Sequence, residues 1–192
     1  MTVTDELVVL LDPHGDPIGE QRKASVHSSR TPLHLAFSLY LFDDRGRLLM
    51  TRRALTKVAW PGVWTNSCCG HPMPGEDMHE AIRRRVRAEL NLDVTDLRCV
   101  LPNFAYRAED ASGIVENERC PVFVGTVVCA GPADDVAPNP DEVMDRAWAD
   151  PIATIDAIAA APFAFSPWCV EQISQLPQLA ARREAAGFRT SG

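Results

Sequence analysis

The sequence predicts a single α/β layered domain, in which strands and helices share one core. Segments typical of strands alternate along the chain with three segments typical of helices. The chain has 192 residues, 46% of them hydrophobic, which suits one domain with one core. No internal repeat or low-complexity linker divides it. We therefore expect residues 1–192 to form one domain that ends in a frayed tail at about 185–192.

The first third of the chain predicts a strand and a hairpin. Residues 6–12 are typical of a strand, and the Pro- and Gly-containing segment 13–19 is typical of a turn. Residues 33–42 and 47–53 are apolar, and the Asp-Asp-Arg-Gly segment between them predicts that they pair as a hairpin. Residues 59–74 show no clear period, so we expect an ordered loop with a short strand.

The clearest element is a helix over residues 77–90. Met78, Ile82, Val86 and Leu90 recur every four positions, which places them on one helical face. Acidic residues fill its first turn, and Asn91 follows it, where a left-handed cap is typical. Beyond it, we expect strands over 97–106, 120–129 and 143–148 and helices over 151–160 and 167–183.

Charge indicates the class of ligand. The formal net charge is −7, from 26 acidic and 19 basic residues, which disfavours a protein held to nucleic acid by bulk charge. The basic residues are nevertheless clustered, at Arg52, Arg53 and Lys57 and again over residues 83–87. Such clusters suit a small anionic ligand. The alternative is a solvated basic face.

Location and redox state follow from what the sequence lacks. No apolar run approaches the ~20 residues of a membrane span, and no signal peptide is evident, so we expect a cytoplasmic protein without a membrane partner. No two of the six cysteines have the C-x-x-C spacing. We expect reduced thiols rather than disulfides.

Three histidines and two glutamates are candidate metal ligands. His27, His34 and His71 lie in different segments, and a lone histidine is more often an ordinary polar residue than a ligand. Glu116 and Glu118 are two positions apart, so in a strand they point to the same side. Two carboxylates on one side repel each other unless a cation or a proton lies between them. Imidazoles with carboxylates would suit Zn²⁺ or Mn²⁺.

The predicted helix carries one further pair. Arg85 and Glu89 are four positions apart and share a helical face. They form either an internal salt bridge or a diphosphate site, in which the arginine binds phosphate oxygens and the glutamate holds a Mg²⁺ shared with the diphosphate.

The segment from Gly70 to Leu92 resembles the Nudix box, G-x5-E-x7-R-E-U-x-E-E-x-G-U, in a degenerate form. Arg85, Ala88 and Asn91 replace two glutamates and a glycine of the pattern, whereas Glu89 is retained. Nudix hydrolases hold Mg²⁺ with that carboxylate cluster, so its loss counts against hydrolysis.

A Nudix box with these departures resembles that of the type I isopentenyl-diphosphate isomerases, which share the Nudix fold. The match runs in order through most of the chain, from about Lys23 to Trp168, in segments 33–37, 51–55, 59–67, 69–72, 112–118 and 165–168. Several motifs in one order are far more specific than a degenerate box. The resemblance implies an α/β/α sandwich of the Nudix type with a mixed β-sheet.

The resemblance also implies the site. The catalytic metal, Mn²⁺, Zn²⁺ or Mg²⁺, would be bound by His27, His34, His71, Glu116 and Glu118. The diphosphate would be bound by Lys23, Arg53, Lys57 and Arg85, with Mg²⁺ held by Glu89 and the backbone carbonyl of Cys69. Proton transfer would fall to Cys69 and Glu118, with Tyr106 assisting and Trp168 facing the developing cation. The protein is expected to be a monomer whose partner is a small diphosphate.

The implied reaction is the reversible isomerisation of isopentenyl to dimethylallyl diphosphate through a tertiary carbocation. It needs two proton-transfer groups on opposite sides of the substrate, and a thiol and a carboxyl from separate segments meet that need. Cys68 adjoins Cys69, and neighbours in an extended segment point opposite ways, so we expect Cys68 to be structural. Two alternatives stay open: a Nudix hydrolase of a nucleoside diphosphate derivative, and a non-catalytic metal or diphosphate sensor.

Overall fold

Two mixed β-sheets organise the protein, whose computed structural model describes residues 6–128, 137–177 and 179. The smaller sheet has the order β2-β1-β3-β10-β9. Its strands are β1 (Leu7–Leu11), β2 (Pro17–Arg22), β3 (His34–Leu35), β9 (Ala105–Glu109) and β10 (Val115–Arg119). The larger sheet has the order β12-β5-β4-β11-β8, with β6 paired to β5 and β7 to β4. Its strands are β4 (Phe37–Phe42), β5 (Leu48–Arg53), β6 (Trp64–Thr65), β7 (Cys68–Gly70), β8 (Asp93–Leu101), β11 (Val122–Val128) and β12 (Val143–Ala149).

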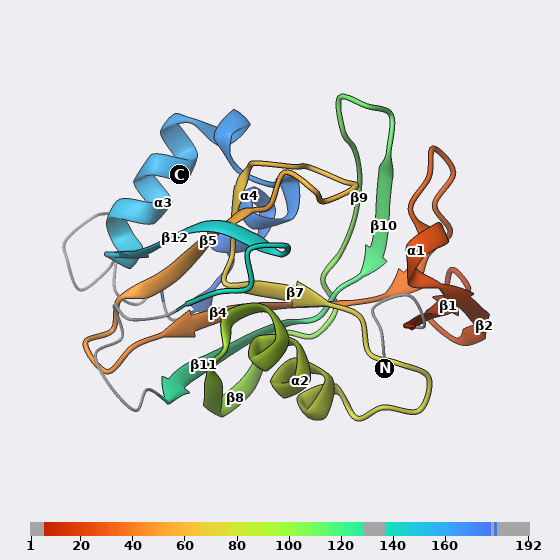
Figure 1. Ribbon diagram of the computed structural model, residues 1–192, viewed down its shortest axis with the longest axis horizontal. Coiled ribbons are helices and arrows are strands. Elements are labelled where there is room, and N and C mark those ends of the chain that lie inside the picture. The colour runs from red at the N-terminus through yellow and green to blue at the C-terminus, as the bar shows by residue number, and fades with distance from the viewer. Residues whose placement is uncertain (1–5, 129–136, 178, 180–192) are drawn as a thin grey trace.

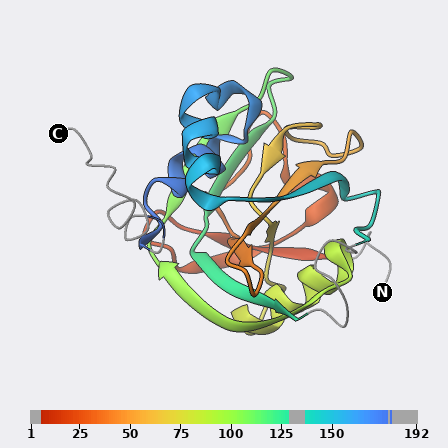
Figure 2. The ribbon, with the colours of Figure 1, turned by 90° about the vertical axis from the view of Figure 1, so that its left-hand side faces the viewer.

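Helices cover both faces of the larger sheet, which gives the three layers of an α/β/α sandwich (Figure 1). One face packs against α2 (Met78–Leu90), and the other against α3 (Pro151–Ala160) and α4 (Pro167–Ile173). The short helices α1 (Lys23–Val26) and η3 (Pro162–Ala164) complete the set. Figure 2 shows the sheet from the side, with the helices apart on either face. No helix within the described ranges has the length and apolar character needed to span a bilayer.

Strand β4 shows why the larger sheet has a hydrophobic cluster on each of its two faces. Its side chains alternate, so Phe37, Leu39 and Leu41 pack toward α2, whereas Tyr40 packs toward α4. All four side chains have no exposed surface. Burying a large apolar side chain contributes about 1.5–3 kcal/mol, so a strand apolar on both faces stabilises both layers.

Helix α2 confirms the predicted helix over residues 77–90. Asp77 caps its first turn by accepting from the backbone N–H groups of His79 and Glu80. Asn91 ends it in the left-handed conformation, at φ 53°. The buried face of the helix includes the charged residues Arg85 and Glu89 as well as apolar side chains. A charged pair on a buried helical face marks the point where the helix meets the site.

Two neighbouring segments pass together from the smaller sheet to the larger one. The first changes sheet at Ala36, between β3 and β4, and the second at Cys120 and Pro121, between β10 and β11. The strands are parallel on both sides of this transition. Hydrogen bonds from the Ala36 N–H to the Arg119 carbonyl (2.9 Å) and from the Ser38 N–H to the Pro121 carbonyl (3.1 Å) keep the segments paired across it.

Several predicted boundaries are wrong. The strand expected over 97–106 is two strands in different sheets, because Pro102 has no N–H to continue a ladder and the chain turns there. The expected turn over 13–19 ends earlier, since β2 begins at Pro17. The loop over 59–74 holds two short strands, β6 and β7, rather than one.

The helix expected over 167–183 is interrupted: α4 ends at Ile173, and the chain is helical again at Pro177 and Leu179. Pro177 explains this, because its ring and its missing N–H prevent the preceding turn from continuing. Residues 180–183, Cys129 and the tail expected to fray at 185–192 lie outside the described residues. The short helix α1 and the β9–β10 hairpin were not predicted.

Candidate active site

A cavity of about 540 Å³ gathers nearly all of the residues predicted for the site. Its lining includes Lys23, His27, Arg53, Lys57, Cys69, His71, Arg85, Glu89, Tyr106, Glu116, Glu118 and Trp168. The remaining predicted residue, His34, is fully buried behind this lining. Residues from both sheets, α1, α2 and α4 therefore converge on one space.

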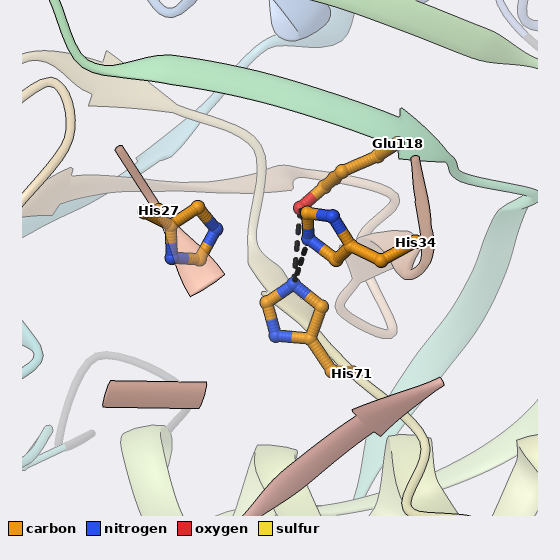
Figure 3. Close-up of side chains that lie close together, drawn as sticks. All are labelled: His27, His34, His71 and Glu118. Carbon is orange, nitrogen blue, oxygen red and sulfur yellow. Dashed lines mark hydrogen bonds and ion pairs between the residues drawn. The ribbon is translucent and has the colours of Figure 1, made fainter. Parts of the chain in front are cut away.

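Four side chains at one end of the cavity point at a common centre: His27, His34, His71 and Glu118 (Figure 3). Each offers one ligand atom, and these atoms all lie within 4.8 Å of one another. The Nε2 atom of His71 is 3.0 Å from Glu118 Oε1 and 3.2 Å from His34 Nε2. His34 donates from Nδ1 to the Pro32 carbonyl at 2.9 Å, so in the neutral ring the lone pair of Nε2 is directed toward the other three side chains. This donor set is suited to a divalent metal ion.

Glu116 lies beside this group rather than within it. Its Oε2 atom is 2.9 Å from His27 Nε2, yet both atoms are buried and neither forms a hydrogen bond. Two such orphaned atoms are costly unless a further group completes them. These side chains therefore fit a bound cation, which would coordinate the two atoms that the protein leaves without a hydrogen bond.

The electrostatics of the two carboxylates differ. Burial and the charge of Glu118 raise the pKa of Glu116. Burial also opposes ionisation of Glu118, but the contacts with the imidazoles of His34 and His71 hold its pKa well below its usual range. Burial lowers the pKa of His71 to about 3, so this imidazole stays neutral, as a metal ligand must be.

Strand pairing places these ligands. Glu116 and Glu118 are both buried in β10 on either side of the half-buried Asn117, so they share a face as predicted. Glu118 lies directly across the parallel β3–β10 pair from His34. His71 follows Gly70, the last residue of β7. A Cβ atom on Gly70 would lie 2.8 Å from Arg85 Cγ, so only glycine lets α2 approach this strand so closely.

The opposite end of the cavity carries cations paired with carboxylates. Lys23 Nζ is 2.7 Å from Glu6, and Lys57 is paired with Glu142. Arg85 contacts three carboxylates: it is paired with Glu89, and its terminal nitrogens lie 3.2 Å from Glu142 and 3.6 Å from Glu6. The predicted salt bridge between Arg85 and Glu89 is thus present, among groups that would also suit a diphosphate.

Glu6 and Glu142 were not predicted as site residues. Their contacts join chain segments far apart in sequence, so no local spacing points to them. Burial alone would raise the pKa of Glu142, but Lys57 and Arg85 lower it to about 2. The cations are therefore charge-balanced and held in place before any anion binds.

Arg53 lies between the two ends. Its guanidinium donates to the carbonyls of Ala59 (2.8 Å) and Trp60 (3.1 Å) and lies 5.3 Å from the centre of the Trp168 ring. The guanidinium therefore lies within cation–π range of the Trp168 ring. Tyr106 packs beside the same ring, with centroids 5.5 Å apart.

Tyr106, Glu118 and Cys69 line the same cavity and carry its proton-transfer groups. Tyr106 donates its hydroxyl to Glu118 Oε2 at 3.0 Å, so the two oxygens of Glu118 face different partners. The Cys69 thiol lies 3.3 Å from Asn66 Oδ1 and 3.5 Å from Ser38 Oγ. Burial raises the pKa of Cys69 to about 11, which keeps the thiol protonated at neutral pH. A proton donor and a carboxylate therefore line the same cavity.

Known proteins match this arrangement over most of the chain. The NUDIX domain family matches residues 32–169. Among curated relatives, the isopentenyl-diphosphate Delta-isomerase of Agromyces mediolanus is 57% identical over 180 residues, which is 94% of this chain and 85% of the relative. The proteins of the same name from Mycolicibacterium vanbaalenii and Frankia alni are 56% and 55% identical and cover 91% and 98% of this chain, and 93% and 94% of their own. The chain belongs to the isopentenyl-diphosphate Delta-isomerase family, within the NUDIX family.

Solved structures confirm the fold on which this isomerase family is built. A protein from Deinococcus radiodurans superposes with a TM-score of 0.68 at 19% identity, covering 90% of this chain and 99% of its own. A MutT protein from Methanosarcina mazei gives 0.57 at 17% identity, covering 80% and 96%. At such identities the likeness concerns the fold alone.

In this member of the isomerase family, the retained part of the Nudix box braces the loop before α2. Arg84 donates to both carboxylate oxygens of Glu76, at 2.7 and 2.8 Å, and to the His71 carbonyl at 3.1 Å. Glu76 also accepts from the Met73 N–H at 2.8 Å. These contacts fix the backbone that presents His71 to the site.

The adjacent cysteines point in opposite directions, as expected. Cys68 is buried in the core against α2, and its thiol lies 3.6 Å from Glu89 Oε2. Cys69 faces the cavity. Cys68 is therefore a core residue that also touches the glutamate expected to hold Mg²⁺.

Proposed function

We propose that this protein catalyses the reversible isomerisation of isopentenyl diphosphate to dimethylallyl diphosphate, a step of isoprenoid biosynthesis. One observation supports this above all: the Cys69 thiol and the Glu118 carboxylate line the same cavity, together with a cation cluster and the aromatic side chains of Tyr106 and Trp168. The names of the curated relatives agree with it.

The chemistry requires a proton to be added at one carbon and removed at another. In one direction, a proton leaves one member of the pair Cys69 and Glu118 and forms a C–H bond at the terminal alkene carbon. The tertiary carbocation that results loses a proton from the neighbouring carbon to the other member, and the double bond forms in its new place. In the reverse reaction the two groups exchange roles.

The aromatic wall suits such a cation. Trp168 is 2% exposed and has Tyr106 and Trp60 packed around it, so its ring presents a desolvated π-face. An indole face stabilises a desolvated cation by about 2 kcal/mol. The same packing keeps water from a carbocation that would react with it.

The metal ligands would act around Glu118. His27, His34, His71 and Glu118, with Glu116 beside them, would hold one divalent ion, Mn²⁺, Zn²⁺ or Mg²⁺. When bound, that ion supplies positive charge that orients the Glu118 carboxylate and tunes its proton affinity. Tyr106 holds the second oxygen of Glu118 toward the cavity by donating to it.

The diphosphate would bind at the other end. Charge-assisted donors would come from Lys23, Arg53, Lys57 and Arg85, all of which line the cavity, and Arg53 also lies beside Trp168. Glu89 would hold a Mg²⁺ ion shared with the diphosphate, together with the Cys69 carbonyl. Binding energy from this remote group positions the carbon skeleton against the proton-transfer pair.

A turnover assay tests the proposal. The purified protein with Mg²⁺ and Mn²⁺ should convert isopentenyl diphosphate to dimethylallyl diphosphate, measured by proton NMR, and should take up deuterium from D₂O. Release of phosphate or nucleotide from a panel of nucleoside diphosphate derivatives would instead identify a hydrolase. Binding without turnover of either class would identify a sensor. The monomeric state stays a prediction, which sedimentation velocity tests.

A further inference from the structure

We propose that Asn66 is a positioning residue that fixes the Cys69 thiol and the Trp168 indole relative to each other. This inference rests on the proposed function, because it assumes that the thiol transfers a proton and that the indole faces the resulting cation. It assigns a role to a segment, Thr65 to Ser67, that belongs to a matched motif but has no role in the proposed mechanism.

A single oxygen atom connects the two groups. Asn66 Oδ1 accepts from the Trp168 Nε1–H at 3.0 Å and from the Cys69 thiol at 3.3 Å. It also accepts from the Thr65 hydroxyl at 2.8 Å. Asn66 has no exposed surface, so these protein donors occupy its oxygen without competition from solvent.

The orientation of this amide is fixed by its other end. Asn66 Nδ2 donates to the carbonyls of Leu39 (3.1 Å) and Cys68 (2.9 Å). Rotating the amide by 180° would turn its oxygen toward two carbonyl oxygens and its NH₂ toward three donors. The Asn66 carbonyl is in turn held by the Thr51 hydroxyl at 2.8 Å. The oxygen is therefore held facing the thiol, the indole and the Thr65 hydroxyl.

This geometry sets the direction of the thiol. A carboxamide oxygen can only accept, so the S–H group must donate to it. The sulfur also contacts Ser38 Oγ, which accepts from Gln172 Nε2 at 3.0 Å and lies 3.5 Å from the Cys69 sulfur and 3.4 Å from the Cys120 sulfur. Asn66 Oδ1 is therefore the contact of the Cys69 sulfur that can act only as an acceptor, and both Asn66 and Ser38 are fully buried.

The same oxygen sets the plane of the indole. Because Nε1–H is tied to Asn66, the Trp168 ring cannot swing about its side-chain bonds, and its face stays beside Tyr106 and Arg53. The stabilisation of a cation by a ring depends on the cation lying over the ring face. One amide therefore couples the direction of the proton donor to the position of the cation-stabilising face.

Substitution of Asn66 tests the proposal, with its neighbour Ser67 as a matched control. Ser67 is equally buried, and its hydroxyl bonds the backbone of Leu41 and Leu49 on the sheet without contacting Cys69 or Trp168. We expect Asn66→Ala to lower kcat by about 10²-fold, as expected for reacting groups misplaced by about 1 Å. KM should change by less than about threefold, since Asn66 does not contact the cation cluster. Ser67→Ala should keep kcat within about threefold of the unsubstituted protein.

A readout independent of turnover keeps this test separate from that of the proposed function. In ¹⁵N-tryptophan-labelled protein, the Trp168 indole N–H, assigned by its loss in Trp168→Phe, should exchange slowly with solvent. In Asn66→Ala its signal should shift and its exchange should quicken, whereas Ser67→Ala should leave both unchanged. Failure of the unsubstituted protein to convert isopentenyl diphosphate would refute the proposed function alone.

Either of two results would overturn the role of Asn66. One is a fast-exchanging Trp168 indole in the unsubstituted protein, a measurement that needs no variant to fold. The other is an Asn66→Ala protein whose kcat matches that of Ser67→Ala, or whose loss lies in KM alone.

Discussion

Glu142 joins the cation cluster from a segment that the sequence does not single out, and its replacement has a calculable effect on stability. Its pKa falls from the usual 4.5 to about 2, because Lys57 and Arg85 favour the carboxylate despite burial. Each unit of difference between the unfolded and folded pKa corresponds to about 1.4 kcal/mol, so the ionised carboxylate contributes about 3 kcal/mol to the free energy of unfolding at neutral pH. The side chain is 14% exposed, so little of this is lost to solvent screening.

The sign of the pH dependence follows from the lowered pKa. The contribution is complete above pH 4.5, the unfolded value, and is lost as the pH falls toward 2. We expect Glu142→Gln to lower the free energy of unfolding by about 3 kcal/mol at pH 7 and by about 2 kcal/mol at pH 3.5. Urea unfolding of both proteins at the two pH values measures the difference.

The neighbouring Asp141 provides the control. It is exposed, and Asp141→Asn should change the free energy of unfolding by less than about 0.5 kcal/mol at either pH. Two results would refute the reasoning: a loss below 1 kcal/mol in Glu142→Gln at pH 7, or a loss of the same size at both pH values. The second would show that the residue acts through packing rather than through its charge.

Three further predictions concern the chemistry. Cys69→Ala should lower kcat by about 10²–10⁴-fold with a small change in KM, whereas Cys68→Ala should keep most activity. Cys69→Ser should be nearly inactive, because a hydroxyl is a weaker acid than a thiol. Activity in both alanine variants would exclude a thiol mechanism. Glu89→Gln should weaken the Mg²⁺ dependence of turnover, at a cost of roughly 1.5–3 kcal/mol, and an unchanged Mg²⁺ titration would indicate a plain salt bridge with Arg85. Metal analysis after chelation and reconstitution should find one divalent ion at the histidine group. That ion should be lost in His27→Ala but kept in the controls His79→Ala and His14→Ala. Full activity of the chelated protein would contradict the assignment.

The sequence predicts best what depends on neighbouring residues. Helix α2 could be placed to within a residue, because its apolar period, its Asp77 cap and its Asn91 terminus are all local. The family resemblance predicted thirteen site residues, of which twelve line one cavity and the other, His34, lies buried beside His71 and Glu118. Those residues span the chain from Lys23 to Trp168, which no periodicity could have connected.

What the sequence does not reveal depends on long-range pairing. The division into two sheets separates β8 from β9 at Pro102, and a single proline does not tell which sheet the chain joins after it. Glu6 and Glu142 reach Arg85 only because the segments before β1 and before β12 fold against α2. Asn66 resembles an ordinary loop polar residue until the indole and the thiol are seen on one oxygen.

The passage of two parallel strands between sheets has a consequence for how the site comes into existence during folding. His34 and Glu118 face each other just before the transition, and His71 is separated from them by 37 and 47 positions of chain. A chain in which only one sheet has formed cannot hold all of these ligands, so the metal group requires closure of several long loops. An ion that needs the complete group binds the native state alone and stabilises it by mass action. Metal uptake would therefore report complete folding, and a chain trapped with one sheet unformed would lack the ion.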